Sequence, residues 1–489
     1  MDESVKQKAA KGMLWSLIQR FSSVTIQFIS GIILARLLTP SDYGVIGMLL
    51  IFMVVAQALM DGGFGSALIQ RKNPTQEDYS TIFWWNMGMS LVLYGVMYAI
   101  SPWVADFYHM PILCKVLRVQ SLVLIINALS LVQANQLSKQ FRFKKIMFVN
   151  MTSSVISLFV TIYLAYHGYG VWSLVFQNLL MAFIPMTIYW CTNKWFPSFV
   201  FSKESFRSLF SFGFFIFLTH LINEVCNNIQ GLLIGRFFNA SMMGYYSKAR
   251  STEKLAASSI SQALQQVTFP LYSALQDDKK TLVDTVRRLT QYVAFLVFPL
   301  MFCLILVAKP AFVLIYSERW IPSVPYFQAF CLLGLSGCLQ SINTQTIAAI
   351  GKSKQMFGWT IVKRSVGIVM IVLGLVFWGI WGLVWASVIH NWLVYIVNVS
   401  LISKYIKCSF SSQIYCLIPV LAIAVVSFSV TYLMCRHIDM NMYLKGGLQI
   451  LCYVAIYLGL AYLFKLSSFQ FYKGKLINFL SRGKKCFMS

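Results

Sequence analysis

The chain has 489 residues, of which 58% are hydrophobic and 11% are charged, and its mean hydropathy is +0.69. A soluble domain carries about 25% charged residues, so this composition excludes a soluble protein and predicts an integral membrane protein. The formal net charge of +25 does not indicate a nucleic-acid partner, because the basic residues gather in alternate loops and at both ends of the chain, as in membrane proteins.

A series of apolar stretches of about 20 residues runs along the chain, and each stretch is long enough to cross the hydrocarbon as a helix. No polar stretch between them is long enough to bury a core of its own. The sequence therefore predicts an all-α integral membrane protein with 14 transmembrane helices. The stretches begin near Met13, Gly44, Ile82, Leu117, Ile146, Gly170, Leu209, Gly244, Leu289, Pro325, Phe357, Ile380, Ile414 and Tyr443.

The basic loops set the predicted orientation of these helices. Basic residues gather at 6–11, 71–72, 139–145, 194–207, 279–288, 352–354, 404–407 and 473–485, whereas the alternate connections between these segments hold few basic residues. Because cytosolic loops carry the excess of Lys and Arg, we expect both termini in the cytosol of a bacterial inner membrane protein. The first stretch lacks a small-residue cleavage pattern, so we expect it to remain as the first helix.

The chain contains an internal repeat. Gly31–Gly44 (GIILARLLTPSDYG) recurs as Gly231–Gly244 (GLLIGRFFNASMMG) at an offset of 200 residues (231 − 31). Gly170–Val175 (GVWSLV) recurs as Gly379–Val384 (GIWGLV) at an offset of 209 residues (379 − 170). Two matches in one order predict two similar six-helix halves. An even number of helices per half predicts a pseudo-two-fold axis along the membrane normal.

The repeat predicts the domain organisation. The expected parts are a cytosolic N-terminal segment (1–12), an N-terminal six-helix bundle (13–195), a cytosolic linker (196–208), a C-terminal six-helix bundle (209–404), an appended helix pair (405–466) and a basic cytosolic tail (467–489).

Five segments carry a resemblance to a known family: Leu34–Met48, Gly63–Lys72, Gly168–Val175, Gly231–Ala249 and Val267–Asp278. They resemble the Wzx-type polysaccharide and lipopolysaccharide flippases of the multidrug/oligosaccharidyl-lipid/polysaccharide superfamily, in particular colanic-acid exporters. The resemblance implies a V-shaped fold and alternating access. It also implies a cargo of oligosaccharide linked to a polyprenyl diphosphate such as undecaprenyl diphosphate. In that family the first two helices of each half line the central cavity.

Polar residues form continuous faces on these same helices. They are Ser16, Arg20, Ser23, Gln27 and Ser30 on the first; Gln57 and Asp61 on the second; His220, Glu224, Asn227 and Gln230 on the seventh, with Asn223 and Asn228 beside them; and Arg250, Lys254, Ser258, Ser261 and Gln265 on the eighth. Their spacings of three and four residues place them on one side of each helix. Charge inside a membrane is costly, so such faces are expected to line a cavity.

These faces predict a cargo site and a coupling site. Guanidinium, ammonium and amide groups suit a diphosphate and sugars, and the predicted cargo residues are Arg20, Gln27, Asn223, Asn227, Arg250 and Lys254. Glu224 and Asp61 are predicted to balance charge or to take up a coupling ion, H+ or Na+. Structural alternatives remain open: Arg20 could extend to the headgroups, and Asp61 could pair with Arg71 or Lys72 at a helix end.

Two alternatives to a flippase are a membrane enzyme and a drug antiporter. A membrane enzyme normally needs a polar loop or a cluster of His, Asp and Glu at one face, and the five histidines are scattered. A cation-coupled small-molecule or drug antiporter is the alternative within transporters. No catalytic residue, metal site or cofactor is predicted. The expected partners are the lipid-linked oligosaccharide, membrane lipids and polysaccharide polymerase machinery.

Overall fold

The computed structural model describes residues 3–275, 278–350, 353–406 and 410–474, and within these ranges the chain forms helices and short connections without any strand. The predicted all-α class is therefore confirmed. The helices divide into two compact units, residues 1–247 and 248–489, and the division falls inside one long helix, α10 (Ala240–Ala274). The two units are described separately below.

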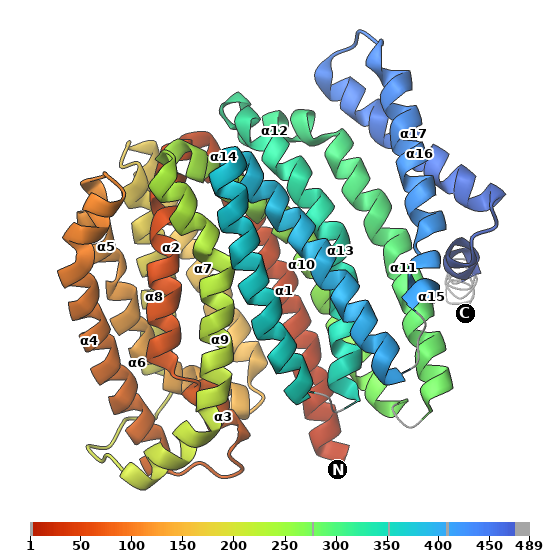
Figure 1. Ribbon diagram of the computed structural model, residues 1–489. Helices are drawn as coiled ribbons and strands as arrows, with labels where there is room; N and C mark the ends of the chain where they lie inside the picture. The colour runs from red at the N-terminus through yellow and green to blue at the C-terminus, as the bar shows by residue number, and fades with distance from the viewer. Residues whose placement is uncertain (1–2, 276–277, 351–352, 407–409, 475–489) are drawn as a thin grey trace, which may run out of the picture. The chain divides into compact units, whose positions relative to one another are not determined.

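The first unit is built from helices that run alongside one another (Figure 1). Helix α1 packs against α7, α7 against α8, and α2 against α9. Between α8 and α9 the chain is non-helical over residues 193–202. The helices are α1 (Glu3–Leu37), α2 (Pro40–Asp61), α3 (Phe64–Gln70), α4 (Gln76–Phe107), α5 (Ile112–Gln120), α6 (Leu122–Lys139), α7 (Phe143–Tyr166), α8 (Val171–Thr192), α9 (Lys203–Phe237) and the start of α10.

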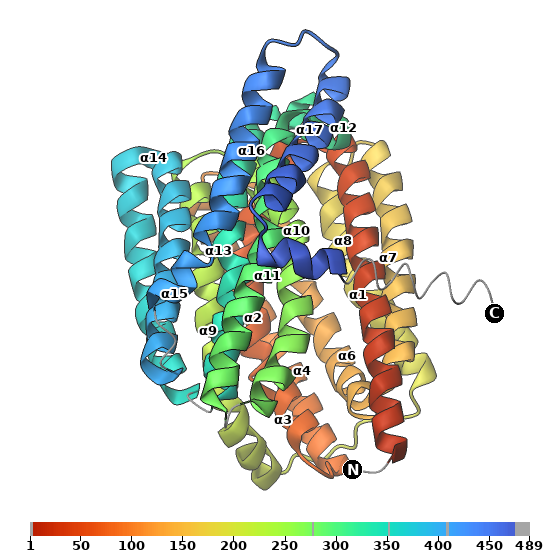
Figure 2. The same ribbon diagram turned by 90° about the vertical axis from the view of Figure 1, so that its right-hand side faces the viewer.

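The second unit begins with the remaining part of α10. Its helix α13 packs against both α11 and α14. The last two long helices, α16 and α17, lie side by side (Figure 2) and pack against α11. The elements are α11 (Lys279–Leu306), α12 (Ala308–Tyr316), the 3-10 helix η1 (Glu318–Ser323), α13 (Val324–Ala349), α14 (Ser353–Ile406), α15 (Phe410–Tyr415), α16 (Ile418–Arg436) and α17 (Met442–Leu463).

Eleven helical segments of the described chain are long and apolar enough to cross a membrane. One of them, within α14, is two helices joined at Trp378 and Gly379, where the backbone leaves the helical conformation. Helix α1 contributes a shorter apolar run, Phe21–Leu37, and the polar face of α10 keeps its hydropathy low. Counting both arms of α14 together with α1 and α10 gives the predicted fourteen.

The repeat is visible in backbone geometry. Thr39 caps α2 by accepting a hydrogen bond from the Asp42 amide at 3.3 Å. At the matching position of the repeat, Asn239 accepts one from the Met242 amide at 2.8 Å at the start of α10. Side-chain oxygens of Thr and Asn satisfy otherwise unpaired amides at a helix start. The repeated motif therefore encodes the same helix start twice.

Two matched glycines bring the beginnings of α2 and α10 into direct contact. A Cβ atom at Gly44 would lie 1.8 Å from the carbonyl oxygen of Ala240, and one at Gly244 would lie 1.8 Å from the carbonyl oxygen of Pro40. Pro40 and Ala240 are themselves matched by the repeat. Each helix start thus rests on the glycine of the other, and a side chain at either position would push the backbones apart.

The second matched pair of glycines marks two equivalent turns. Gly170 precedes α8 with φ 53° and ψ −127°, and Gly379 lies between the arms of α14 with φ 61° and ψ −144°. Only glycine adopts this backbone region easily. In α14 the arms then meet closely, since a Cβ at Gly382 would lie 1.9 Å from the carbonyl oxygen of Gly374.

Candidate functional site

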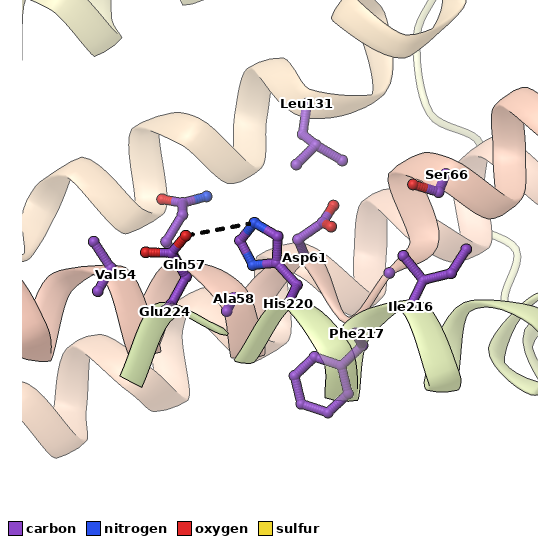
Figure 3. A pocket seen from close by; sticks show the side chains of 11 residues that line it. Val54, Gln57, Ala58, Asp61, Ser66, Leu131, Ile216, Phe217, His220 and Glu224 are labelled. Atoms are coloured by element: carbon purple, nitrogen blue, oxygen red, sulfur yellow. Dashed lines mark ion pairs between the residues drawn. The ribbon is translucent and has the colours of Figure 1, made fainter. Parts of the chain in front are cut away.

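A cavity of about 410 Å³ lies inside the first unit, between α2, α3, α6 and α9. It is lined by Val54, Gln57, Ala58, Asp61, Gly63, Ser66, Leu131, Ile216, Phe217, His220 and Glu224 (Figure 3). The two residues predicted for coupling, Asp61 and Glu224, therefore face the same space. Their helices are far apart in the sequence, and the packing of α2 against α9 brings them together.

The imidazole of His220 lies between the two carboxyl groups (Figure 3). Its Nε2 atom is 3.9 Å from Oε1 of Glu224, which is one turn further along α9. Asp61 faces the other side of the ring, from the end of α2. Two carboxyl groups and one imidazole form a site that favours positive charge, because an opposite charge within about 4–6 Å stabilises the charged form.

Two amide side chains hold the polar groups of this cavity in place. Asn228 on α9 donates from Nδ2 to Oε2 of Glu224 at 3.1 Å and to the Glu224 carbonyl oxygen at 2.8 Å. Asn127 on α6 donates from Nδ2 to Oε1 of Gln57 at 3.0 Å. The side chain of Glu224 is thus held by a hydrogen bond within α9, whereas that of Gln57 is held by a hydrogen bond from the neighbouring helix α6.

Asp61 is positioned by the glycines that follow it. Gly62 and Gly63 have φ values of 54° and 78°, so the chain turns sharply at the end of α2. The carboxylate of Asp61 accepts hydrogen bonds from the backbone of Gly63 and Gly65. Gly63 also lies directly on α9, since a Cβ there would be 2.2 Å from the carbonyl oxygen of Gly213. This turn therefore holds Asp61 at the cavity wall.

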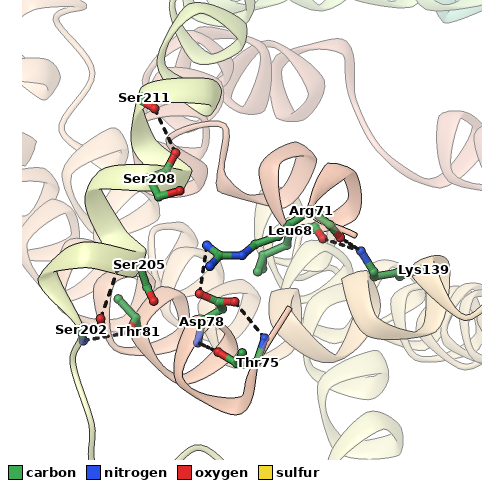
Figure 4. Close-up of polar contacts among 10 residues, drawn as sticks. All are labelled: Leu68, Arg71, Thr75, Asp78, Thr81, Lys139, Ser202, Ser205, Ser208 and Ser211. Atoms are coloured by element: carbon green, nitrogen blue, oxygen red, sulfur yellow. Dashed lines mark hydrogen bonds and ion pairs between the residues drawn. The ribbon is translucent and has the colours of Figure 1, made fainter. Parts of the chain in front are cut away.

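The alternative partner considered for Asp61 is engaged elsewhere. Arg71 pairs with the buried carboxylate of Asp78 at 3.1 Å (Figure 4). Asp78 also closes the capping box of α4 with Thr75. Within the described ranges no ion pair joins Asp61 to Arg71 or Lys72. The helix-end pairing is thus absent from this conformation, and Asp61 remains a cavity residue.

Helix α3 is anchored separately at its C-terminal end. Lys139, the last residue of α6, donates from Nζ to the carbonyl oxygens of Leu68 (3.2 Å), Ile69 (3.1 Å) and Arg71 (Figure 4). Carbonyl groups at a helix C-terminus lack helical partners, and lysine commonly satisfies them. This contact fixes the end of α3, the helix that contributes Ser66 to the cavity wall, and Lys139 itself does not line the cavity.

The predicted cargo residues divide between the two units. In the first unit Gln27 and Asn227 are exposed and Asn223 is partly buried. The side chain of Arg20 lies outside the described part of the structure. In the second unit Lys254 is exposed, and Arg250 is held in an ion pair that is described below. The convergence of these residues on one diphosphate stays a prediction.

Sequence reasoning placed His220 and Gln57 on polar helix faces but gave them no role. The spacing of His220 from Glu224 was the signal that could have identified it. Asn127 and Asn228 were missed as support for the cavity. On α6 the signal that could have indicated Asn127 was the series Asn127, Ser130, Gln133 and Gln136, which follow one another at three-residue steps. In the described residues, no group of three or more His, Cys, Asp and Glu side chains could hold a metal ion.

Comparison with known proteins identifies the family. The model of a family described as polysaccharide biosynthesis protein matches residues 33–325. The chain belongs to this family. The match begins within α1 and ends in α13, so it includes all four helices around the cavity and the whole of α10.

Curated relatives of this family member carry names from glycan biosynthesis. The teichuronic acid biosynthesis protein TuaB of Bacillus subtilis is 26% identical over 358 residues, which cover 73% of this chain and 74% of the relative. The succinoglycan biosynthesis transport protein ExoT of Rhizobium meliloti is 24% identical and covers 71% of each chain. The lipopolysaccharide biosynthesis protein WzxC of Escherichia coli is 24% identical and covers 76% of each chain.

Solved structures share the fold of this family member at low sequence identity. The lipid II flippase MurJ in an inward closed conformation aligns with a TM-score of 0.77 and 16% identity, over 92% of this chain and 98% of that one. An inward-facing multidrug resistance MATE family transporter of the MOP superfamily aligns with a TM-score of 0.58 and 15% identity, over 80% and 95% of the two chains.

Proposed function

We propose that this protein flips a lipid-diphosphate-linked oligosaccharide from the cytosolic to the outer leaflet of a bacterial cytoplasmic membrane, during surface polysaccharide biosynthesis. The family match over residues 33–325 carries this proposal. The relative named as a transport protein for succinoglycan supports export rather than synthesis, and the fold similarity to a lipid II flippase supports a lipid-linked cargo. The proposal includes both termini in the cytosol, because the basic residues gather in alternate loops and at both ends of the chain.

The cargo is held by cationic and amide groups of the polar helix faces. Arg250 and Lys254 on α10 supply the charge that a diphosphate requires, and Arg20 adds a further guanidinium. Arginine can bind phosphate oxygens through two N–H groups at once. Amide side chains such as Asn223, Asn227 and Gln27 suit sugar hydroxyl groups. Outward movement of a dianion from a negative interior also gains about 2.3 kcal/mol per charge per 100 mV.

The acidic cavity of the first unit couples this movement to an ion, and we assign a proton to it. Asp, Glu and His side chains within membrane-spanning segments commonly form the proton pathways of pumps and transporters. A hard cation prefers a shell of oxygen ligands, whereas Gln57 Oε1 already accepts a hydrogen bond from Asn127. Protonation neutralises the carboxylate charge of the cavity, which changes the interaction between α2 and α9.

The function is tested by deleting the gene in its host and restoring it on a plasmid. We expect the deletion to abolish surface polysaccharide and to leave lipid-linked precursor in the inner leaflet, and the wild-type gene to restore export. The precursor's leaflet is read by access of a membrane-impermeant glycosidase in intact and lysed spheroplasts. Normal surface polysaccharide in the deletion strain, together with plasmid-dependent expulsion of a cationic dye, would instead establish the drug-antiporter function.

A further inference from the structure

A buried carboxylate pairs with the predicted cargo arginine in the second unit. Nη1 of Arg250 lies 2.8 Å from Oε2 of Glu253, three residues further along α10. The Glu253 side chain is only 3% exposed, whereas that of Arg250 is 28% exposed. The pair therefore has one member enclosed by protein and one that reaches open space.

Helix α13 is shaped around both members of this pair. Phe330 presents its ring 5.2 Å from the guanidinium carbon of Arg250. One turn later Gly334 leaves room for the carboxylate, since a Cβ there would lie 2.8 Å from Oε1 of Glu253. Phe330 is itself fully buried. The guanidinium is thus held between an aromatic face and a carboxylate, in a fixed orientation.

The opposite face of α10 is anchored independently of the pair. The ammonium group of Lys248 lies over the ring of Tyr316 at 4.2 Å and near that of Trp320 at 5.6 Å. Thr252 adds a hydrogen bond of 3.1 Å between its hydroxyl group and that of Tyr316. These contacts fix α10 against α12 and η1. Exchange of the partner of Arg250 therefore does not require the helix to detach.

We propose that Glu253 is an exchangeable counter-ion, which neutralises Arg250 in the empty transporter and is replaced by the diphosphate when cargo binds. The proposal rests on the proposed function, because it takes Arg250 as a cargo ligand. Carboxylate and phosphate compete for the same N–H groups of a guanidinium. In the loaded state Glu253 is left as a buried charge without its partner, which is unfavourable. The carboxylate therefore weakens cargo binding and drives release.

A structural ion pair and an exchangeable one respond oppositely to neutralisation of the carboxylate. If Glu253 only stabilises α10, Glu253→Gln weakens both cargo binding and export, because Arg250 loses the ion pair that orients it on the helix. If Glu253 competes with cargo, the same substitution removes the competitor. Affinity for a diphosphate then rises while export slows, because release becomes harder. The separation of binding from turnover distinguishes the two roles.

The experiment measures binding of farnesyl diphosphate to the purified full-length protein in detergent, with farnesol as the uncharged control ligand. Because the substitution removes the competing carboxylate, we expect Glu253→Gln to bind farnesyl diphosphate roughly tenfold more tightly, which corresponds to about 1.4 kcal/mol. Farnesol binding should not change. In cells the variant should export less polysaccharide than wild type at equal protein level. Unchanged or weaker diphosphate binding by Glu253→Gln overturns the proposal.

Two further variants keep the outcome clear. Glu253→Asp retains the charge on a shorter side chain, so it should fold even if the glutamine variant does not, and its affinity should lie between those of wild type and Glu253→Gln. Affinity equal to or below wild type would contradict the proposal. Arg250→Ala tests the cargo site itself: normal export and binding there would remove the cargo role of Arg250. If Arg250→Ala loses binding and neither Glu253 variant gains affinity, Arg250 keeps its role as a cargo ligand and the counter-ion role of Glu253 is excluded.

Discussion

At the scale of single residues, the acidic cavity brings together the two side chains predicted for coupling, through the packing of helices that are distant in the sequence. Asp61 and Glu224 are 163 residues apart (224 − 61), and each was recognised because charge within an apolar stretch is costly. The residue that lies between them, His220, could be seen on the same helix face. Its function could not be derived, because helical spacing reveals the face of α9 and not what α2 places opposite it.

Neutral variants of the two carboxyl groups test the coupling role. We expect Glu224→Gln and Asp61→Asn each to slow export several-fold and to weaken its dependence on a pH gradient, because each variant removes an acidic group from the proposed proton pathway. The measurement is polysaccharide export at two external pH values, with protein level controlled. Glu204→Gln is the matched control, since Glu204 is an exposed carboxylate at the start of the same helix, α9. Full pH dependence in both cavity variants would exclude coupling at this site.

At the scale of helices, the repeated motif shows why some elements were predictable and others were not. Thr39 and Asn239 are good helix caps, so the starts of α2 and α10 follow from local chemistry. Apolar length identifies most membrane-spanning helices. The short helices α3, α5 and α12 were not predicted as separate elements. Each of these short helices adjoins an apolar run, so hydropathy does not separate it from the neighbouring long helix. The separation comes from turns such as Gly62–Gly63, which form when the helices pack.

The contact between α2 and α10 predicts that substitution of either of its two glycines destabilises the protein by a similar amount. We expect Gly44→Ala and Gly244→Ala each to destabilise the protein by about 1–3 kcal/mol, the usual cost of forcing a methyl group into a packed contact. Thermal unfolding in detergent, followed by intrinsic fluorescence, gives the comparison. Gly88→Ala is the control, because a Cβ at Gly88 meets nothing within 4 Å. Equal melting temperatures for all three variants would show that the two helix starts do not press on each other.

At the scale of the whole molecule, the positive-inside pattern predicts a topology that the helix bounds alone do not define. Fourteen crossings are an even number, which places both ends on one side, and the basic clusters assign that side to the cytosol. The long apolar helices of the described chain support its membrane location and leave its orientation open.

Single cysteines in a variant without native cysteines test this topology. A cysteine at Ser241, near the start of α10, should react with a membrane-impermeant maleimide added to intact spheroplasts. A cysteine at Ser481 in the basic tail should react only after the membrane is opened. The physical reason is that cytosolic thiols are shielded from the reagent by the bilayer. Labelling of both positions from outside would contradict the predicted orientation.

The turn at Trp378 and Gly379 has a consequence for how the protein is made. The two arms of α14 are joined without a loop, and Gly374 and Gly382 bring their backbones into contact. Small residues at such a contact let helices approach closely within lipid. The arms can therefore leave the insertion machinery as one preassembled hairpin, already paired before the neighbouring helices arrive. We therefore expect this region to insert in a single step that delivers two crossings together.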